Sequence, residues 1–335
     1  MATIKDVARL AGVSTATVSR ALNNIPTVDA ALTRQVQEAA ATLGYRPNGV
    51  ARSLRRQRTD VLALIISDIG NSFFTSVARG VEDVAQLRNF SVILCNSDED
   101  PDKEAKYLAV AQQEQVAGVI LSPNHQGADL SALQQANIPI CIIDRPVREP
   151  VDMVLVESRL GAREGTAHLF AEGWTRPACV TGPTSATTAQ ERLQGYLAAW
   201  RSARRRSTQA LVRHADYRAE SGRAAASSLL DQPKPPDSFF VANSSMALGV
   251  LDELAHRGLR AGHDVGLVAF DDAPWAPFVA PPLSVVAQPA YEVGTRAAEL
   301  LTNRIEGRAD LTPRIVTLPT RLVVRTSSQR NSIAG

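Results

Sequence analysis

The first 58 residues restrict the fold of this chain more than any other stretch. From residue 3 they read T-I-K-D-V-A-R-L-A-G-V-S-T-A-T-V-S-R-A-L, in which apolar residues recur at helical spacing. Thr3 and Ser14 stand where helix N-caps are expected, and Asp6 gives the first helix an acidic version of a capping box. Gly12 stands where that helix should end. Two short helices across a tight turn with glycine predict a helix-turn-helix motif.

A third helix, capped by Asp29, is expected to close the small core of this motif. Its predicted buried stripe consists of Leu32, Val36, Ala40 and Leu43. In the second helix, Val18 and Leu22 are expected to face inward, whereas the outward side chains are small, hydroxyl-bearing or basic. Such side chains can approach base edges closely in the major groove. The outward positions are Thr15, Ala16, Thr17, Ser19 and Arg20.

The charge of this segment indicates a nucleic-acid partner. Residues 1–58 hold nine basic and three acidic side chains, a net charge of +6, whereas the whole chain carries +2 and the remainder therefore −4. A basic head on an acidic body is the electrostatic pattern expected of a protein that binds phosphates. A charge run is more often only a solvated surface, but this one coincides with the helix-turn-helix pattern.

The sequence G-Y-R-P-N-G-V-A-R-S-L follows at residues 44–54. Together with the helix-turn-helix segment, it resembles the head of the lactose/galactose-repressor (LacI/GalR) family of bacterial transcription regulators. The resemblance implies a hinge helix from Asn48 to Leu54, with Ala51 among its DNA contacts, that folds when a dimer sits on its operator. The leucine then wedges into the minor groove and kinks the DNA. The main base-reading residues that the resemblance implies are Thr15, Ala16 and Arg20.

After a polar joint at residues 55–60, short apolar strands alternate with helical stretches, which predicts an α/β fold with parallel sheets. The predicted strands are 61–67, 91–95, 118–122, 138–144, 153–156, 178–182, 210–213, 238–241 and 265–270. The predicted helices are 76–88, 102–113, 160–171, 189–201, 220–230 and 245–257. The series restarts near residue 160, which favours two similar lobes, and the resemblance implies a periplasmic-binding-protein-like pair of lobes around a ligand cleft.

This gives an expected domain organisation. Residues 1–46 form the helix-turn-helix domain and residues 47–59 the hinge helix and linker. Residues 60–330 form an effector-binding and dimerisation domain, with lobes at about 60–158 and 159–286 and crossover segments near 287–325. The polar tail beyond Arg325 has no leucine heptads, so a homodimer is expected rather than a coiled-coil tetramer.

Polar and aromatic side chains gather where the predicted strands end, and ligands of open parallel sheets bind at such ends. Aromatic faces suit the C–H faces of a sugar, carboxylates accept from its hydroxyls, and a guanidinium binds vicinal oxygens. The expected effector-binding residues are Ser67, Asp68, Phe73, Phe74, Ser122, Asp144, Thr188, Arg192, Tyr217, Asn243, Asp271, Trp275 and Gln288. Ten of these also match pocket positions of the family.

Several of these residues have an equally simple structural interpretation. Phe73 and Phe74 can pack a helix, Asp271 can cap a strand end, and Trp275 either stacks on the ligand or packs under its loop. The chain also departs from the family at two places. It reads A-N-S-S where A-N-D is common, so one carboxylate is absent, and V-D-A-A-L-T-R where V-S-x-x-T-R is common, which should change only local phosphate contacts.

Other function classes lack support in the sequence. There is no phosphate-binding loop, no serine nucleophile elbow and no H-E-x-x-H, and the five histidines are scattered, so neither enzyme activity nor a cofactor is expected. Three cysteines in apolar runs fit a reducing cytoplasm. No signal peptide and no apolar run of about 18 residues is found, so no membrane contact is expected.

The sequence therefore predicts a homodimeric repressor that binds a palindromic operator and is controlled by a small effector, a mono- or disaccharide. Three alternatives stay open: a purine-responsive repressor with the same cleft, a sugar-binding transport component, and a soluble enzyme that uses the cleft.

Overall fold

The computed structural model describes residues 2–22, 28–45, 59–205, 207, 209–310 and 312–330. The chain divides into two compact units, Met1–Arg58 and Thr59–Gly335. The hinge helix expected at Asn48–Leu54 lies outside the described residues.

The first unit contains the three expected helices. They are α1 (Ile4–Leu10), α2 (Thr15–Leu22) and α3 (Ala30–Thr42). Gly12, at the end of the first helix, has a φ of 61°, the left-handed conformation that glycine adopts without strain. The helix-turn-helix arrangement predicted for this segment is confirmed.

The predicted caps of these helices are confirmed as well. The backbone N and Oγ1 of Thr3 donate to the Asp6 carboxylate over 2.9 and 2.7 Å. Ser14 Oγ accepts from the backbone N of Thr17 (3.0 Å), and the Asp29 carboxylate accepts from the first turn of α3. Each cap satisfies backbone donors that the helix itself leaves unpaired.

The buried stripe of α3 differs from the prediction at one position. Val36 and Ala40 are buried and Leu43 packs against the core, as expected, but Leu32 is only half-buried and Ala39 is buried instead. The buried face thus has the spacing i, i+3, i+4, i+7 from Val36, the usual stripe of a packed helix.

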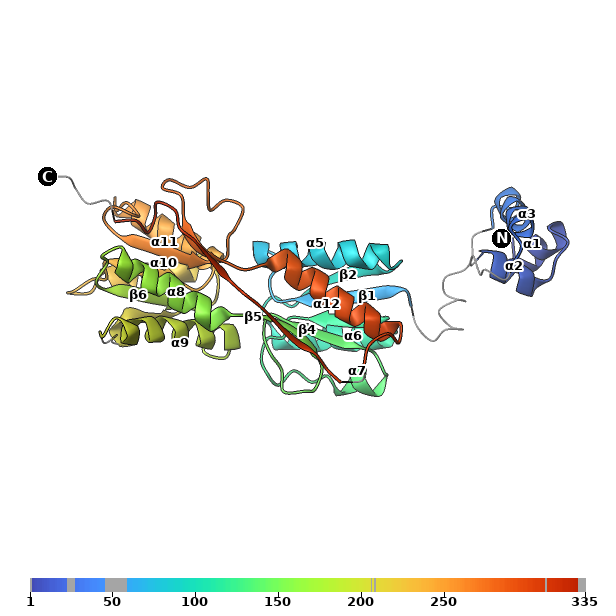
Figure 1. Cartoon of the computed structure of the whole chain (residues 1–335), viewed down its shortest axis with the longest axis horizontal. Helices are drawn as coiled ribbons and strands as arrows, with labels where there is room; N and C mark the ends of the chain where they lie inside the picture. Colours follow the sequence, from blue (N-terminus) through green and yellow to red (C-terminus); the bar gives the residue numbers. More distant parts are fainter. Residues whose placement is uncertain are drawn as a thin grey trace. The chain divides into compact units, whose positions relative to one another are not determined.

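The second unit contains two lobes with one six-stranded sheet each (Figure 1). The strands of lobe 1 are β1 (Val61–Ile66), β2 (Ser91–Asn96), β3 (Gly118–Leu121), β4 (Ile140–Ile143), β5 (Asp152–Val156) and β11 (Ile315–Leu318). Those of lobe 2 are β6 (Pro177–Thr181), β7 (Val212–His214), β8 (Ser238–Val241), β9 (Gly266–Phe270), β10 (Ser284–Ala287) and β12 (Arg321–Val323). The strand orders are β11-β5-β4-β3-β1-β2 and β12-β10-β9-β8-β6-β7, and among these described strands only the pair β10–β12 is antiparallel.

Helices pack against both sheets and bury the inner strands such as β1, β3, β8 and β9, whereas the edge strand β2 keeps Ile93 and Leu94 exposed. The helices of lobe 1 are α5 (Ser72–Leu87), α6 (Pro101–Gln113), α7 (Ser131–Gln135) and α12 (Ala290–Ile305). Those of lobe 2 are α8 (Ser158–Ala171), α9 (Thr187–Ser202), α10 (Ala219–Leu230) and α11 (Ser244–His256). The helices pack in pairs, α5 with α12, α8 with α9, and α10 with α11.

Three crossovers join the lobes (Figure 1). The chain passes to lobe 2 between β5 and α8, returns to lobe 1 between β10 and α12, and passes to lobe 2 again between β11 and β12. Three adjacent crossovers make a hinge about which two compact lobes can open and close.

Some predicted boundaries were wrong for physical reasons. The helix predicted at 76–88 begins at Ser72, because the Asn71 side chain accepts from the backbone N of Phe73 and caps it there (2.9 Å). The strand predicted at 210–213 begins only at Val212, since a 3₁₀ turn occupies Gln209–Leu211. No helix among the described residues has the length and apolar character that a bilayer span requires.

Candidate functional site

The outward face of α2 is the candidate base-reading surface. Thr15, Ala16 and Arg20 are exposed, and Ala16 and Arg20 stand four residues apart on one helix face. Thr17 and Ser19 are half-buried, and the Thr17 hydroxyl lies 2.8 Å from Ser14 Oγ. The first turn of α2 therefore presents small side chains and the last turn a cation. The hinge positions Asn48, Ala51 and Leu54 lie outside the described residues.

The second candidate site is a central cavity between the two lobes. Ten of the thirteen expected effector-binding residues line it: Asp68, Phe73, Phe74, Asp144, Thr188, Arg192, Tyr217, Asn243, Asp271 and Gln288. Its volume is about 30 Å³, room for roughly two water molecules. The described conformation is thus closed, because side chains from both lobes occupy the space that a ligand needs.

Arg192 is one of two buried cations that line the central cavity, the other being Arg145. The side chain of Arg192 is buried, its Nη1 donates to the carbonyl oxygen of Ala242 (2.6 Å), and its guanidinium lies 4.0 Å from the ring centroid of Phe270. Its Nε has no hydrogen-bond partner among the described residues. A buried guanidinium with an unused donor is prepared to bind a ligand oxygen, because leaving such a donor unpaired costs free energy.

Two buried carboxylates accompany this cation. Burial raises the pKa of Asp144 and of Asp271 above the ordinary value, and the positive charge of Arg192 opposes that rise in both. Gln288 Nε2 donates a short hydrogen bond to Asp271 Oδ1, whereas Gln288 Oε1 has no partner in the part of the chain that the structure describes. The cavity therefore holds an unused acceptor as well as an unused donor.

Backbone strain marks four of the cavity residues. Glu99, Asp144, Tyr217 and Asp271 have φ values of 57°, 65°, 70° and 75°, a region that residues other than glycine seldom adopt. Such strain concentrates at ligand sites, where the surrounding structure holds it. Tyr217 also depends on Gly182, because a Cβ there would lie 2.2 Å from the Tyr217 ring.

Other cavity residues are committed to contacts inside their own lobe. Asn243 caps α11 by accepting from the backbone N of Met246 (2.8 Å) and donates to the carbonyl oxygen of Tyr217 (3.0 Å). Phe73 and Phe74 pack edge-to-face in the core of lobe 1, with ring centroids 5.0 Å apart, while also lining the cavity. These two rings therefore pack in the core of lobe 1 and line the cavity at the same time.

Three expected residues do not line the central cavity. Ser67 and Ser122 are fully buried, with their hydroxyl oxygens 3.1 Å apart. Trp275 is half-buried and packs against the core of lobe 2. Trp275 is thus not among the residues that line the central cavity.

Sequence reasoning missed the pair Glu99 and Arg145 and the cap Asn71, all of which line the cavity. Arg145 is buried and donates from both terminal nitrogens to Glu99 (2.6 and 2.7 Å). Its guanidinium also lies 5.6 Å from the Tyr217 ring of the other lobe. Its position directly after Asp144, at the end of a predicted strand, was the available signal.

No metal site accompanies the cavity in the part of the chain that the structure describes, where no cluster of three or more His, Cys, Asp or Glu side chains is placed to hold an ion. Cys141 and Cys179 are buried in β4 and β6, and burial raises the pKa of both thiols.

Comparison with known proteins gives two family matches. Residues 3–48 match the family described as bacterial regulatory proteins, lacI family, and residues 166–328 match a periplasmic binding protein-like domain. A ribose operon repressor from Halalkalibacterium halodurans is 35% identical over 329 residues, which cover 98% of each chain.

Two solved structures resemble the chain over nearly its whole length. The complex of the transcriptional regulator CelR with cellobiose has a TM-score of 0.75 and 32% identity, and the match covers 98% of this chain and 100% of that one. The lac repressor dimer bound to operator and the anti-inducer ONPF has a TM-score of 0.86 and 26% identity, with 98% and 99% covered.

Proposed function

Because the chain belongs to the lacI family of bacterial regulatory proteins and is a DNA-binding transcriptional regulator, we propose that it represses a sugar-utilisation operon under the control of a sugar. The observation that carries this proposal is the pair of unused groups in the central cavity. Arg192 Nε needs an acceptor and Gln288 Oε1 needs a donor. A sugar hydroxyl is both donor and acceptor, so a sugar ring can satisfy both groups.

The remaining cavity groups support the same ligand class. Phe73 and Tyr217 supply aromatic faces, and Asp144 and Asp271 supply carboxylates. A purine has a flat ring and few donors, and it would leave more of these carboxylates unpaired. We therefore favour a sugar over the purine alternative. The match of residues 3–48 to bacterial regulatory proteins argues against the transport alternative, because sugar transport does not require a DNA-binding domain.

The proposed DNA contacts follow from the head. Residues 1–46 bind the major groove, residues 47–59 form the hinge, and residues 60–330 bind effector and dimerise. The proposed base-reading residues of α2 are Thr15, Ala16, Thr17, Ser19 and Arg20, and those of the hinge are Asn48, Ala51 and Leu54. As a homodimer in the cytoplasm, the protein places two heads on a palindromic operator.

Control requires that sugar binding changes the lobes. The central cavity of about 30 Å³ is too small for a sugar, so binding must open the lobes or rotate side chains. The crossovers give the lobes a hinge for such a motion. Effector and operator then influence each other through a coupling free energy of about 1–3 kcal/mol.

Two measurements test the proposal. Selection from random duplexes with purified protein should enrich one palindromic sequence, and a thermal-shift panel of pentoses, hexoses, disaccharides and purine bases should show stabilisation by a sugar. Stabilisation by purines alone would replace the sugar with a purine. A protein that enriches no sequence at low salt, where phosphate contacts are strongest, would contradict operator binding itself.

A further inference from the structure

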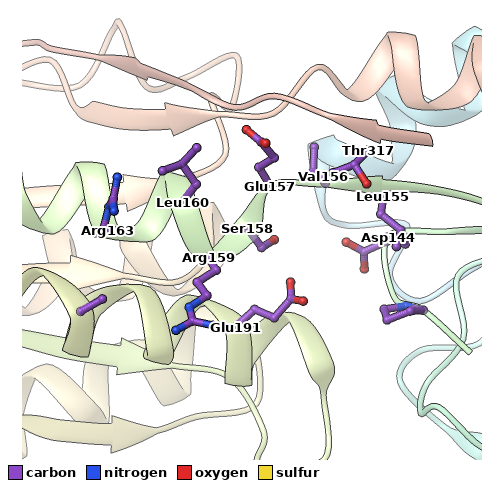
Figure 2. A pocket seen from close by; sticks show the side chains of 12 residues that line it. Asp144, Leu155, Val156, Glu157, Ser158, Arg159, Leu160, Arg163, Glu191 and Thr317 are labelled. Carbon is purple, nitrogen blue, oxygen red and sulfur yellow. The ribbon is translucent and has the colours of Figure 1, made fainter. Parts of the chain in front are cut away.

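A second cavity lies between the lobes, next to the crossover from β5 to α8 (Figure 2). Its volume is about 510 Å³, within the range of ligand pockets, and it shares Asp144 with the central cavity. We name it the hinge-side pocket and define it by Asp144, Leu155, Ser158, Arg159, Leu160 and Glu191. Its size contrasts with the closed central cavity, so it is open to an occupant in the described conformation.

A buried polar atom on the wall of this pocket lacks a partner. Ser158, the first residue of α8, is 1% exposed, and its Oγ makes no hydrogen bond with any residue that the structure describes. The residue before it, Glu157, does not cap the helix with its side chain. The first turn of α8 therefore offers an unpaired hydroxyl beside backbone donors that the helix leaves free.

Charges of both signs surround the same space. Glu157 and Glu191 contribute carboxylates beside Asp144, and Arg159 and Arg163 contribute guanidinium groups (Figure 2). Within the described parts of the chain, neither these two arginines nor these two glutamates make a side-chain hydrogen bond or ion pair. Burial raises the pKa of Glu191, with Arg192 opposing the rise.

This mixture of charges selects the kind of occupant. A phosphate would meet three carboxylates, and an amine would meet two guanidinium groups. Neutral hydroxyls can instead donate to the carboxylates and accept from the guanidinium groups and from Ser158. Leu155 and Leu160 add an apolar wall suited to the C–H face of a ring. The pocket thus fits a neutral hydroxylated ring better than an ion.

We propose that the hinge-side pocket binds a second sugar ring, so that the effector is a disaccharide or glycoside whose first ring occupies the central cavity. Asp144 faces both spaces and joins the two subsites. This inference rests on the proposed function, since it presumes a sugar in the central cavity. Because the pocket touches the β5–α8 crossover and Thr317 near the β11–β12 crossover, the second ring contacts the hinge itself.

Titration calorimetry with matched sugars tests this inference. The full-length protein is titrated with glucose and cellobiose, galactose and lactose, and ribose, each as a pure probe. At least one disaccharide should bind about ten-fold or more tightly than its monosaccharide. Glu191→Gln should reduce that ratio several-fold, and Glu191→Trp, which also fills the pocket, should bring it close to one.

The matched control is Glu164→Gln, an exposed carboxylate on α8 that does not line the pocket, and it should keep the wild-type ratio. Melting temperatures of all variants without ligand show whether they fold. A disaccharide preference that survives Glu191→Trp in a folded protein overturns the second subsite, as does monosaccharide binding without any disaccharide preference. The proposed function stands in both cases, whereas it fails together with the second subsite if none of the probes or the wider panel of sugars binds.

Discussion

At the scale of single residues, the proposed effector recognition depends most on Arg192. This buried cation lowers the pKa of both Asp144 and Asp271 against the effect of burial, and its Nε has no hydrogen-bond partner among the described residues. Arg192→Ala should leave operator binding within about two-fold of wild type but abolish the effector response, since removing a buried charge-assisted contact costs about 2–5 kcal/mol. Gel-shift titrations with and without the effector measure both. If the variant still responds to effector, the effector does not bind in the central cavity.

Asp271 gives a pH-dependent prediction. Burial raises its pKa in the folded protein above the ordinary 3.8, so the folded state keeps a proton that the unfolded chain has released. The free energy of unfolding therefore falls as pH rises from 3.8 through the raised pKa. Asp271→Asn removes this loss, so the variant should become more stable relative to wild type as the pH rises from 4 to 7. Urea melts of both proteins at pH 4 and at pH 7 measure the difference. The control is Asp102→Asn at an exposed position, which should change the urea midpoint by the same amount at pH 4 and at pH 7.

The close contact between Gly182 and Tyr217 in the cavity wall leaves no room for a side chain at position 182. An added Cβ would lie 2.2 Å from the Tyr217 ring, so Gly182→Ala must displace that ring. We expect a loss of about 1–3 kcal/mol in stability, typical of overpacking, together with weaker effector binding. Gly127→Ala is the control, because the nearest atom to its Cβ would be His125 Nδ1 at an ordinary 3.5 Å. Equal urea midpoints for the two variants would contradict the steric argument.

At the scale of elements, α2 carries the prediction for DNA. Arg20 is exposed in its last turn, four residues from exposed Ala16. Arg20→Ala should cost about 1–3 kcal/mol in operator binding and relax base preference at one position of each half-site. Selection from a random library shows the preference directly. The exposed Arg148→Ala of the second unit removes the same charge and should leave the selected sequence unchanged.

Most helices and strands of the protein were predictable from its sequence. Caps such as Asp29 and buried apolar runs such as Val61–Ile66 depend on residues close together in the chain. The start of α5 was missed because Phe73 and Phe74 are compatible with a strand end as well as with a first helical turn. The Glu99–Arg145 pair was missed because two other strands, β3 and β1, lie between β2 and β4 in the sheet, a separation that the order of the chain does not reveal. Neither did the sequence indicate how completely side chains close the central cavity.

At the scale of the whole molecule, the proposed function requires that binding at two sites in different units is energetically coupled. The central cavity belongs to Thr59–Gly335, whereas the head belongs to Met1–Arg58. Coupling between them must be reciprocal: the factor by which effector changes operator affinity equals the factor by which operator changes effector affinity. For about 1–3 kcal/mol this factor is roughly 5 to 150.

Leu54→Gly separates the coupling from the two binding sites. Glycine removes the proposed minor-groove wedge and weakens the hinge helix, so operator affinity should fall at least ten-fold and the coupling factor should approach one. Effector affinity of the free protein should stay at the wild-type value, because the central cavity is built from residues of the other unit. Calorimetry with effector, with and without operator duplex, gives both numbers. A loss of effector affinity in the free variant would mean that the substitution damages the fold, and an unchanged coupling factor would mean that the signal reaches the DNA without the hinge.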